Sequence, residues 1–244
     1  MSTVPDRLFA DPRLAAVYDA LEPDRDDLDA YVAMAREFAA HTVVDVGCGT
    51  GCLAVLLAAR GFDVVGVDPA AASLEVARAK PSADSVRWIH GVAADLPVLQ
   101  ADLVVMTGNV AQAITDPDDW AATLAAAARV LRPGGRLVFE SRDPAAQGWL
   151  EWNPLWSRAY ADVPGIGPVE SFVETTEVAL PLVTFRTTFR LGVDDAVLTS
   201  DSTLRFRTRD EVQEDLRQQG FVVDDVRDAP DRPGREWVFV ARKP

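Results

Sequence analysis

A glycine-rich turn between two short apolar runs constrains this chain more than any other feature. The segment VVDVGCGTG, residues 43–51, precedes the apolar helical pattern of residues 53–60, and VVGVDP then ends a second apolar run at Asp68. This order predicts a strand, a tight turn, a helix and another strand. Glycine lets the backbone turn sharply and approach a ligand, and a carboxylate at a strand end can accept two ribose hydroxyls. The pattern therefore predicts a nucleoside-like ligand.

The composition fits one α/β domain with an insertion and points to a small-molecule partner. The chain has 244 residues, 48% of them hydrophobic, which is enough for a sizeable core. Its net charge of −14 disfavours nucleic acid as a partner, because such binding depends on neutralising phosphates. Charges interrupt the first residues throughout, so neither a signal peptide nor a membrane span is predicted, and we expect a cytoplasmic protein. A monomer and a homodimer both remain open.

The cysteines and histidines predict no metal site. Cys48 and Cys52, the two cysteines, lie four residues apart around the glycine turn, a spacing that fits neither a disulfide framework nor a zinc site. His41 and His90 lie next to predicted strands, where surface or packing roles are more common than catalytic ones. We therefore interpret the cysteines as small packing residues.

Alternating apolar runs and helical patterns predict a Rossmann-like sheet with helices on both faces. Strands are expected at 42–46, 63–67, 86–90, 102–106 and 136–140. Helical patterns between most of them indicate parallel strands with right-handed crossovers. LRPGGR, residues 131–136, is expected to be a turn. The last two apolar runs, FVVDDV and EWVFVAR, are joined by a short connection, which predicts an antiparallel seventh strand.

Three helices are predicted from their periodicity and their ends. Apolar residues at helical spacing mark residues 26–40 as an amphipathic helix leading into the first strand. Asp116 and Pro117 suit the start of a helix that runs to Val130. Thr208 with Glu211 is typical of a capping box.

The composition changes at Gln147, which indicates an inserted region. We expect a helical cover at residues 1–40, a main domain at 41–146 and 208–244, and an inserted lid or substrate region at 147–207. Period-two alternation over 183–191, followed by a return strand at 196–206, predicts an antiparallel hairpin there. The insertion also contains the tryptophans at 149, 152 and 156, which either form the core of a lid or stack against a substrate.

Four separated motifs resemble those of the class I S-adenosylmethionine-dependent methyltransferases that act on small molecules. VDVGCGTG, VVGVDP, GVAADLP and LRPGGRLVFE occur in that family's order and spacing, and the terminal hairpin is similar to its seventh strand. The resemblance implies S-adenosyl-L-methionine as cofactor and in-line methyl transfer to a nitrogen or oxygen of a small molecule. It implies no particular catalytic base.

Two other function classes remain open. A nicotinamide-dependent oxidoreductase would use a G-x-G-x-x-G turn, whereas here the third glycine of that pattern is absent after Gly51 and Cys52. A non-catalytic protein that binds the cofactor, or dimerises through the hairpin, is the other alternative.

The resemblance also implies the residues that bind the cofactor. Asp45 and the glycine turn would hold the methionine portion, Asp68 the ribose, and Asp95 the exocyclic amine of adenine. The implied set is Tyr18, Asp45, Gly47, Cys48, Gly49, Thr50, Gly51, Asp68, Pro69, Ala94, Asp95, Leu96, Thr107, Gly108, Asn109 and Gln112.

The expected acceptor region follows the fifth strand. Its candidates are Glu140, Arg142, Trp149, Trp152 and Trp156.

Four arginines of the hairpin region have two possible roles. They are Arg186, Arg190, Arg205 and Arg207. They would either bind an anionic group or pair with Glu174 and Glu177 across the sheet, and we expect the pairing.

Overall fold

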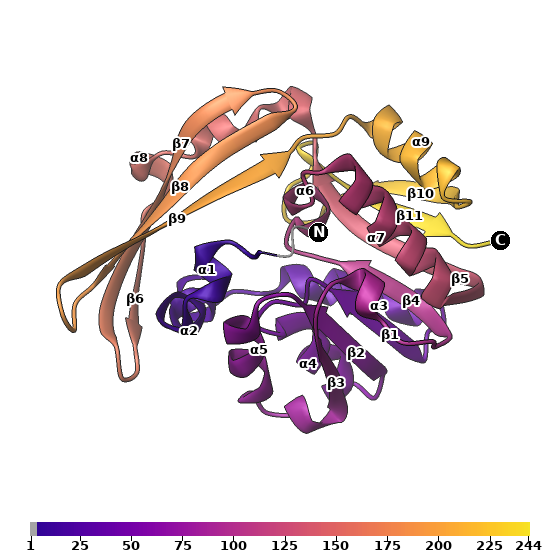
Figure 1. Ribbon diagram of the computed structural model, residues 1–244, viewed down its shortest axis with the longest axis horizontal. Helices are drawn as coiled ribbons and strands as arrows, with labels where there is room; N and C mark the ends of the chain where they lie inside the picture. Colours follow the sequence, from indigo (N-terminus) through magenta and orange to yellow (C-terminus); the bar gives the residue numbers. More distant parts are fainter. Residues whose placement is uncertain (1–3) are drawn as a thin grey trace.

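The computed structural model describes residues 4–244, and its main body is a seven-stranded sheet (Figure 1). The strands are β1 (Thr42–Val46), β2 (Asp63–Asp68), β3 (Val86–His90), β4 (Ala101–Met106), β5 (Leu131–Arg142), β10 (Val222–Asp228) and β11 (Glu236–Arg242). Their order is β10-β11-β5-β4-β1-β2-β3, with β11 antiparallel to both neighbours and the other pairs parallel. The predicted Rossmann-like sheet with its antiparallel last strand is confirmed.

Strict alternation along the strands creates a core on each face of this sheet. On β1, Val44 packs into one cluster with the helices α7 (Pro117–Val130) and α9 (Arg209–Gln218). Its neighbour Val43 packs into the other, with α3 (Asp27–Glu37) and α4 (Cys52–Ala59). Successive side chains of a strand point to opposite faces, so such short apolar runs must be covered on both sides.

The predicted helix ends are present. The Asp116 carboxylate accepts the backbone N–H groups of Asp118 and Asp119 at 2.8 and 3.1 Å and so caps α7. Thr208 and Glu211 form the reciprocal capping box at the start of α9. The remaining helices of this part are α5 (Ala71–Arg78) and α6 (Val110–Ala113).

The prediction of a simple turn at LRPGGR is wrong. β5 already begins at Leu131, which is paired with Ala101, and the pairing then resumes between Leu103 and Arg136. The register of the pair shifts over the residues between Leu131 and Arg136. Among them, Gly134 has a φ of 79°, which suits glycine, and its N–H donates to the Lys243 carbonyl. The C-terminal residues therefore continue the hydrogen bonding of this segment.

Residues 148–206 contribute a second, four-stranded antiparallel sheet that arches away from the main body (Figure 1). Its strands are β6 (Ala159–Val163), β7 (Gly167–Ala179), β8 (Leu182–Leu191) and β9 (Ala196–Arg205), preceded by the short helix α8 (Pro154–Ser157). The predicted hairpin is β8–β9. The strands β6 and β7 on its other side had only a general β-rich composition to indicate them.

Two N-terminal helices connect the second sheet to the main body. They are α1 (Arg7–Ala10) and α2 (Pro12–Leu21). Leu14 and Val17 of α2 are fully buried against the second sheet. From the same helix, the Asp19 carboxylate accepts hydrogen bonds from the Thr50 hydroxyl and the Lys80 ammonium, each at 2.6 Å. The position of α2 is therefore fixed from both sides.

The expected pairing of the hairpin arginines with Glu174 and Glu177 is wrong. Arg186 lies opposite both Glu174 and Asp201 but forms a bidentate pair with Asp201, at 2.7 and 2.9 Å. Arg190 pairs with Glu170, directly opposite on β7. Sequence alone did not fix which acid the strand register places opposite each arginine.

Two further observations concern the whole described chain. Within residues 4–244, no helix is both long and apolar enough to span a bilayer. In the same residues, no group of three or more His, Cys, Asp or Glu side chains is arranged to hold a metal ion.

The packing of α7 on the sheet generates a stability prediction. Leu124 is completely buried between α7 and the strands, so Leu124→Ala removes buried methyl groups and leaves a cavity. We expect a loss of about 2–5 kcal/mol in the free energy of unfolding, measured by urea titration. Val98→Ala, at a position that is 94% exposed, is the matched control and should change it by less than about 0.5 kcal/mol. Equal losses for the two variants would contradict the packing described.

Candidate functional site

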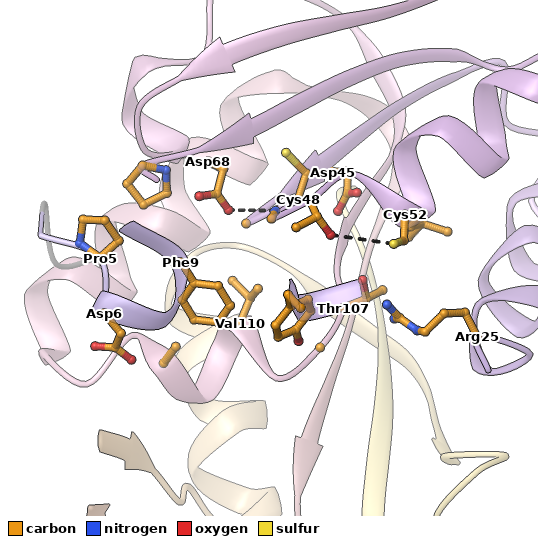
Figure 2. A pocket seen from close by; sticks show the side chains of 18 of the residues that line it. Pro5, Asp6, Phe9, Arg25, Asp45, Cys48, Cys52, Asp68, Thr107 and Val110 are labelled. Carbon is orange, nitrogen blue, oxygen red and sulfur yellow. Dashed lines mark hydrogen bonds between the residues drawn. The ribbon is translucent and has the colours of Figure 1, made fainter. Parts of the chain in front are cut away.

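A cavity lies at the carboxyl ends of β1, β2 and β4, beneath the N-terminal helices (Figure 2). Open α/β sheets bind ligands at this edge. The predicted residues that line it are Tyr18, Asp45, Gly47, Cys48, Gly49, Thr50, Asp68, Pro69, Thr107 and Gly108. The structure therefore brings together side chains from three strand ends and from α2.

The glycine turn has the backbone that its sequence requires. Gly47, Gly49 and Gly51 all have positive φ, at 72°, 54° and 79°. A Cβ at Gly51 would lie 2.5 Å from the Trp88 ring, and one at Gly47 would lie 2.5 Å from Val110. A Cβ at Gly49 would meet no atom within 4 Å. Gly47 and Gly51 are therefore needed for packing, whereas Gly49 leaves its backbone open toward the cavity.

The Asp68 carboxylate fixes the turn from the end of β2. It accepts the N–H of Gly49 and the N–H of Ala70, both at 2.8 Å. Burial raises the pKa of Asp68, and these two hydrogen bonds oppose the rise because they favour the charged form. Each oxygen keeps acceptor capacity, so the side chain can serve the turn and a ligand together.

Asp45 is a buried carboxylate that lacks a full set of partners. It is only 1% exposed, and its Oδ1 receives no hydrogen bond within the part of the chain that the structure describes. Burial, together with the nearby charge of Asp68, raises the pKa of Asp45 to about 7. Such an unpaired buried acceptor is costly, which is typical of a site that a donor group of a ligand completes.

Sequence reasoning missed several residues of the cavity wall. Arg25 points into the cavity from the loop before α3 and is held there by a two-point pair with Asp27, at 3.0 and 3.1 Å (Figure 2). Phe9 enters from α1 and Val110 from α6. Arg25 lies in a polar loop with no distinctive local pattern, so no sequence signal indicated it.

Asn109 and Gln112 lie behind this wall in a buried polar network. Asn109 has a φ of 64°, and its N–H donates to Glu140 Oε1 at 2.9 Å. The other carboxylate oxygen of Glu140 accepts the hydroxyl of Tyr31. With its amide oriented to satisfy these neighbours, Asn109 donates to Gln112 and accepts from Arg142. The network holds the turn whose preceding residues, Thr107 and Gly108, line the cavity.

Glu140 and Arg142 therefore belong to this buried network and do not line the cavity. Burial and the charge of Glu236 raise the pKa of Glu140. Burial lowers the pKa of Arg142. Their role toward an acceptor stays a prediction.

The predicted adenine residues do not line this cavity. Asp95 uses one oxygen to accept the Val92 N–H at 2.9 Å and so closes its own turn. The carbonyls of Ala94 and Leu96 accept hydrogen bonds from Arg129. Gly51 also lies outside the wall, because it packs on Trp88. The adenine contacts therefore stay predictions.

The three tryptophans occupy different environments. Trp149 is buried edge-on against Phe206, with ring centroids 4.8 Å apart. Trp152 packs against Phe185 at the same distance. Trp156 is 75% exposed. Trp149 and Trp152 belong to a small hydrophobic cluster on the second sheet, and none of the three lines the cavity.

Residues 43–135 match the family described as a methyltransferase domain. This segment is therefore similar to methyltransferase domains. This match confirms the resemblance that the glycine turn and the strand-end acids indicate in the sequence. The matched segment includes Asp45 and Asp68 of the cavity.

Among curated proteins, the chain is similar to the cypemycin N-terminal methyltransferase of a Streptomyces species. The two are 34% identical over 119 residues, which is 48% of this chain and 49% of that protein. The chain thus spans about half the length of the curated relatives it matches.

Solved structures share the fold over nearly the whole chain. An S-adenosylmethionine-dependent methyltransferase from Clostridium acetobutylicum has a TM-score of 0.74 at 18% identity, covering 94% of this chain and 97% of that one. The sugar N-methyltransferase KedS8 from a Streptoalloteichus species has a TM-score of 0.73 at 20% identity, covering 92% and 91%. The second sheet thus falls within the aligned fold.

The raised pKa of Asp45 generates a prediction for the ligand-free protein. Its folded-state pKa of about 7 exceeds the ordinary value of 3.8, so the folded state loses stability as pH rises from about 4 to about 7. Residue 45 cannot ionise in the variant Asp45→Asn. The free energy of unfolding of this variant should therefore rise relative to that of wild type over this pH range. We expect an advantage near zero at pH 4 and up to about 4 kcal/mol at pH 8, measured by urea unfolding.

The exposed Asp63 at the start of β2 provides the control for this measurement. Asp63→Asn should track wild type at every pH. A difference between Asp45→Asn and wild type that stays constant with pH would contradict the buried, unpaired carboxylate.

Proposed function

We propose that this protein is an S-adenosylmethionine-dependent methyltransferase that acts on a small-molecule acceptor. The observation that carries the proposal is the pair of buried carboxylates, Asp45 and Asp68, on either side of the glycine turn in one cavity. A ligand with a ribose diol and an ammonium group would complete both. The methyltransferase family match supports this cofactor.

The chain's own residues suggest how the cofactor is oriented. Asp68 would accept the ribose hydroxyls, while the unpartnered Oδ1 of Asp45 would accept the ammonium group of the methionine portion. The guanidinium of Arg25, in the same cavity, would bind the carboxylate. The positive ammonium group of the ligand would therefore face a carboxylate of the wall, and its negative carboxylate would face a guanidinium.

Catalysis would consist of placing the acceptor in line with the transferred methyl group. The sulfonium supplies an electrophilic methyl group with a neutral thioether as leaving group. Holding the two reactants at attack distance supplies most of the acceleration of such a displacement. Among the described residues that line the cavity there is no histidine and no lysine. We infer that the acceptor reacts as a neutral nucleophile without a dedicated histidine or lysine base.

We propose an amine as the acceptor to test before a hydroxyl. The cypemycin enzyme is named as an N-terminal methyltransferase, and KedS8 as a sugar N-methyltransferase. An amine needs only to lose its ordinary proton before it attacks, which fits the absence of a histidine or lysine from the described wall. Incubation with the cofactor and a metabolite extract, followed by mass spectrometry for a gain of one methyl group, tests the activity. No methylated product from extracts or from matched amine and alcohol panels would contradict it.

The role of Asp68 predicts a loss of affinity for both cofactor forms. Asp68→Ala removes the acceptor for the ribose hydroxyls, so S-adenosylmethionine and S-adenosylhomocysteine should both bind about tenfold more weakly or worse, by isothermal titration. Asp63→Ala, at the exposed start of the same strand, should bind both as wild type does. Unchanged affinity in Asp68→Ala would remove this residue from the site.

The proposed contact between Arg25 and the ligand's carboxylate predicts a loss of affinity that is limited to ligands with this group. Arg25→Gln should weaken S-adenosylhomocysteine about tenfold, because a charge-assisted hydrogen bond is lost. It should leave 5′-methylthioadenosine, which lacks the amino-acid portion, unchanged. Equal weakening of both ligands would mean that Arg25 shapes the loop rather than binding the carboxylate.

A further inference from the structure

A second cavity, of about 240 Å³, lies between α7 and α9 and is separate from the first. Trp120 and Leu124 of α7 form its apolar wall, and charged side chains of both signs form the rest. The two cavities share no lining residue. Nothing in the proposed transfer reaction uses this second cavity.

One wall of the cavity carries two arginines without acidic partners. Arg207 is 5% exposed, lies with its guanidinium 4.6 Å from the centre of the Trp120 ring, and donates to the carbonyls of Ala111 and Ile114 at 2.9 and 2.8 Å. Arg205 donates from Nη1 to the Thr115 carbonyl at 3.3 Å. All three acceptors are neutral, so neither guanidinium is closed into a hydrogen-bonded ion pair within the described residues.

Burial and the neighbouring Arg205 lower the pKa of Arg207 to about 10, whereas Asp215 and Glu211 oppose this effect. The guanidinium stays charged at neutral pH. In Arg205, Nε and Nη2 donate to no acceptor within residues 4–244, so this wall still offers N–H groups for an anion.

The face of α9 that lines the cavity carries two carboxylates one turn apart. Glu211 uses Oε2 to accept from the backbone and the hydroxyl of Thr208, at 2.7 and 2.8 Å. Asp215 uses Oδ2 to accept the indole N–H of Trp120 at 2.9 Å. The second oxygen of each carboxylate, Oε1 and Oδ1, accepts nothing in the described part of the chain. This wall therefore offers acceptors.

These opposite charges line one cavity without touching. Elsewhere in the protein such charges close into pairs, as Arg186 and Asp201 do at 2.7 Å. In the described residues, neither Arg205 nor Arg207 has a carboxylate oxygen within 4.0 Å. The cavity is therefore lined by charges of both signs that are not closed into an ion pair.

We propose that this cavity binds a small zwitterion of the α-amino-acid class. Its carboxylate would lie against Arg205 and Arg207, where bidentate recognition is available, and its ammonium group against Glu211 and Asp215. A simple dianion such as phosphate would be repelled by the acids, and a simple cation by the arginines.

Glycine is the minimal probe of this site, with acetate and methylammonium as probes that carry one charge each. Titrations of the intact protein followed at the Trp120 indole N–H by NMR should give saturable shifts for glycine at concentrations at least tenfold below those needed for either single-charge probe. The absence of a saturable glycine shift would overturn the proposal, and so would acetate binding as tightly as glycine.

Two variants separate this site from general effects of charge. Arg205→Gln should weaken glycine about tenfold, while Arg209→Gln, an exposed arginine at the start of α9 outside the cavity, should not. Glu211→Gln keeps a residue that suits the capping box but removes the negative charge, so it should weaken glycine and strengthen acetate. If Glu211→Gln weakens both probes alike, the proposed ammonium contact is wrong.

Discussion

The hydrogen bonds from the backbone of Gly49 and Ala70 to the Asp68 carboxylate determine the shape of the principal cavity. They tie the glycine turn after β1 to the end of β2, two segments that the parallel sheet places side by side. The turn can adopt this path because its glycines have positive φ at no steric cost. The N–H groups of Gly47 and Cys48 also donate to the Val67 carbonyl, at 2.8 and 3.2 Å, so the whole turn is fixed against the end of β2.

This arrangement has an energetic consequence at Asp45. The sheet buries its carboxylate beside that of Asp68, and the first of its oxygens has no partner in the described chain. Two buried acids in one cavity destabilise the empty site and favour a ligand that brings donors and positive charge. Arg25 on the facing loop offers the complementary charge for the other end of such a ligand. We propose that the cost of burying these carboxylates in the empty site is the physical basis of cofactor selection.

Much of the fold could be predicted from sequence, because local rules decide it. Apolar runs separated by helical patterns indicated most of the seven strands, and the side chains of Asp116 and Thr208 cap α7 and α9 as expected. The turn glycines and the acids Asp45 and Asp68 were identifiable because they lie at or just after the strand ends in sequence. These features depend on neighbours within a few residues.

The rest of the site depends on contacts between distant segments. Tyr31 reaches Glu140 across 109 positions of sequence, and Arg25 enters the cavity from a loop without a distinctive pattern. Similarly, Arg186 could pair with an acid on either neighbouring strand, and only the folded geometry selects Asp201. Such choices are tertiary, since they arise from the packing of α2, α3 and the second sheet rather than from local propensity.

The most direct test of the account is a crystal structure of the protein with S-adenosylhomocysteine. The account predicts that both ribose hydroxyls lie within hydrogen-bond distance of the Asp68 carboxylate, and that the ligand's amino group lies within the same distance of Asp45 Oδ1. A ligand bound with its ribose away from Asp68, or one that leaves Asp45 unpartnered, would contradict it.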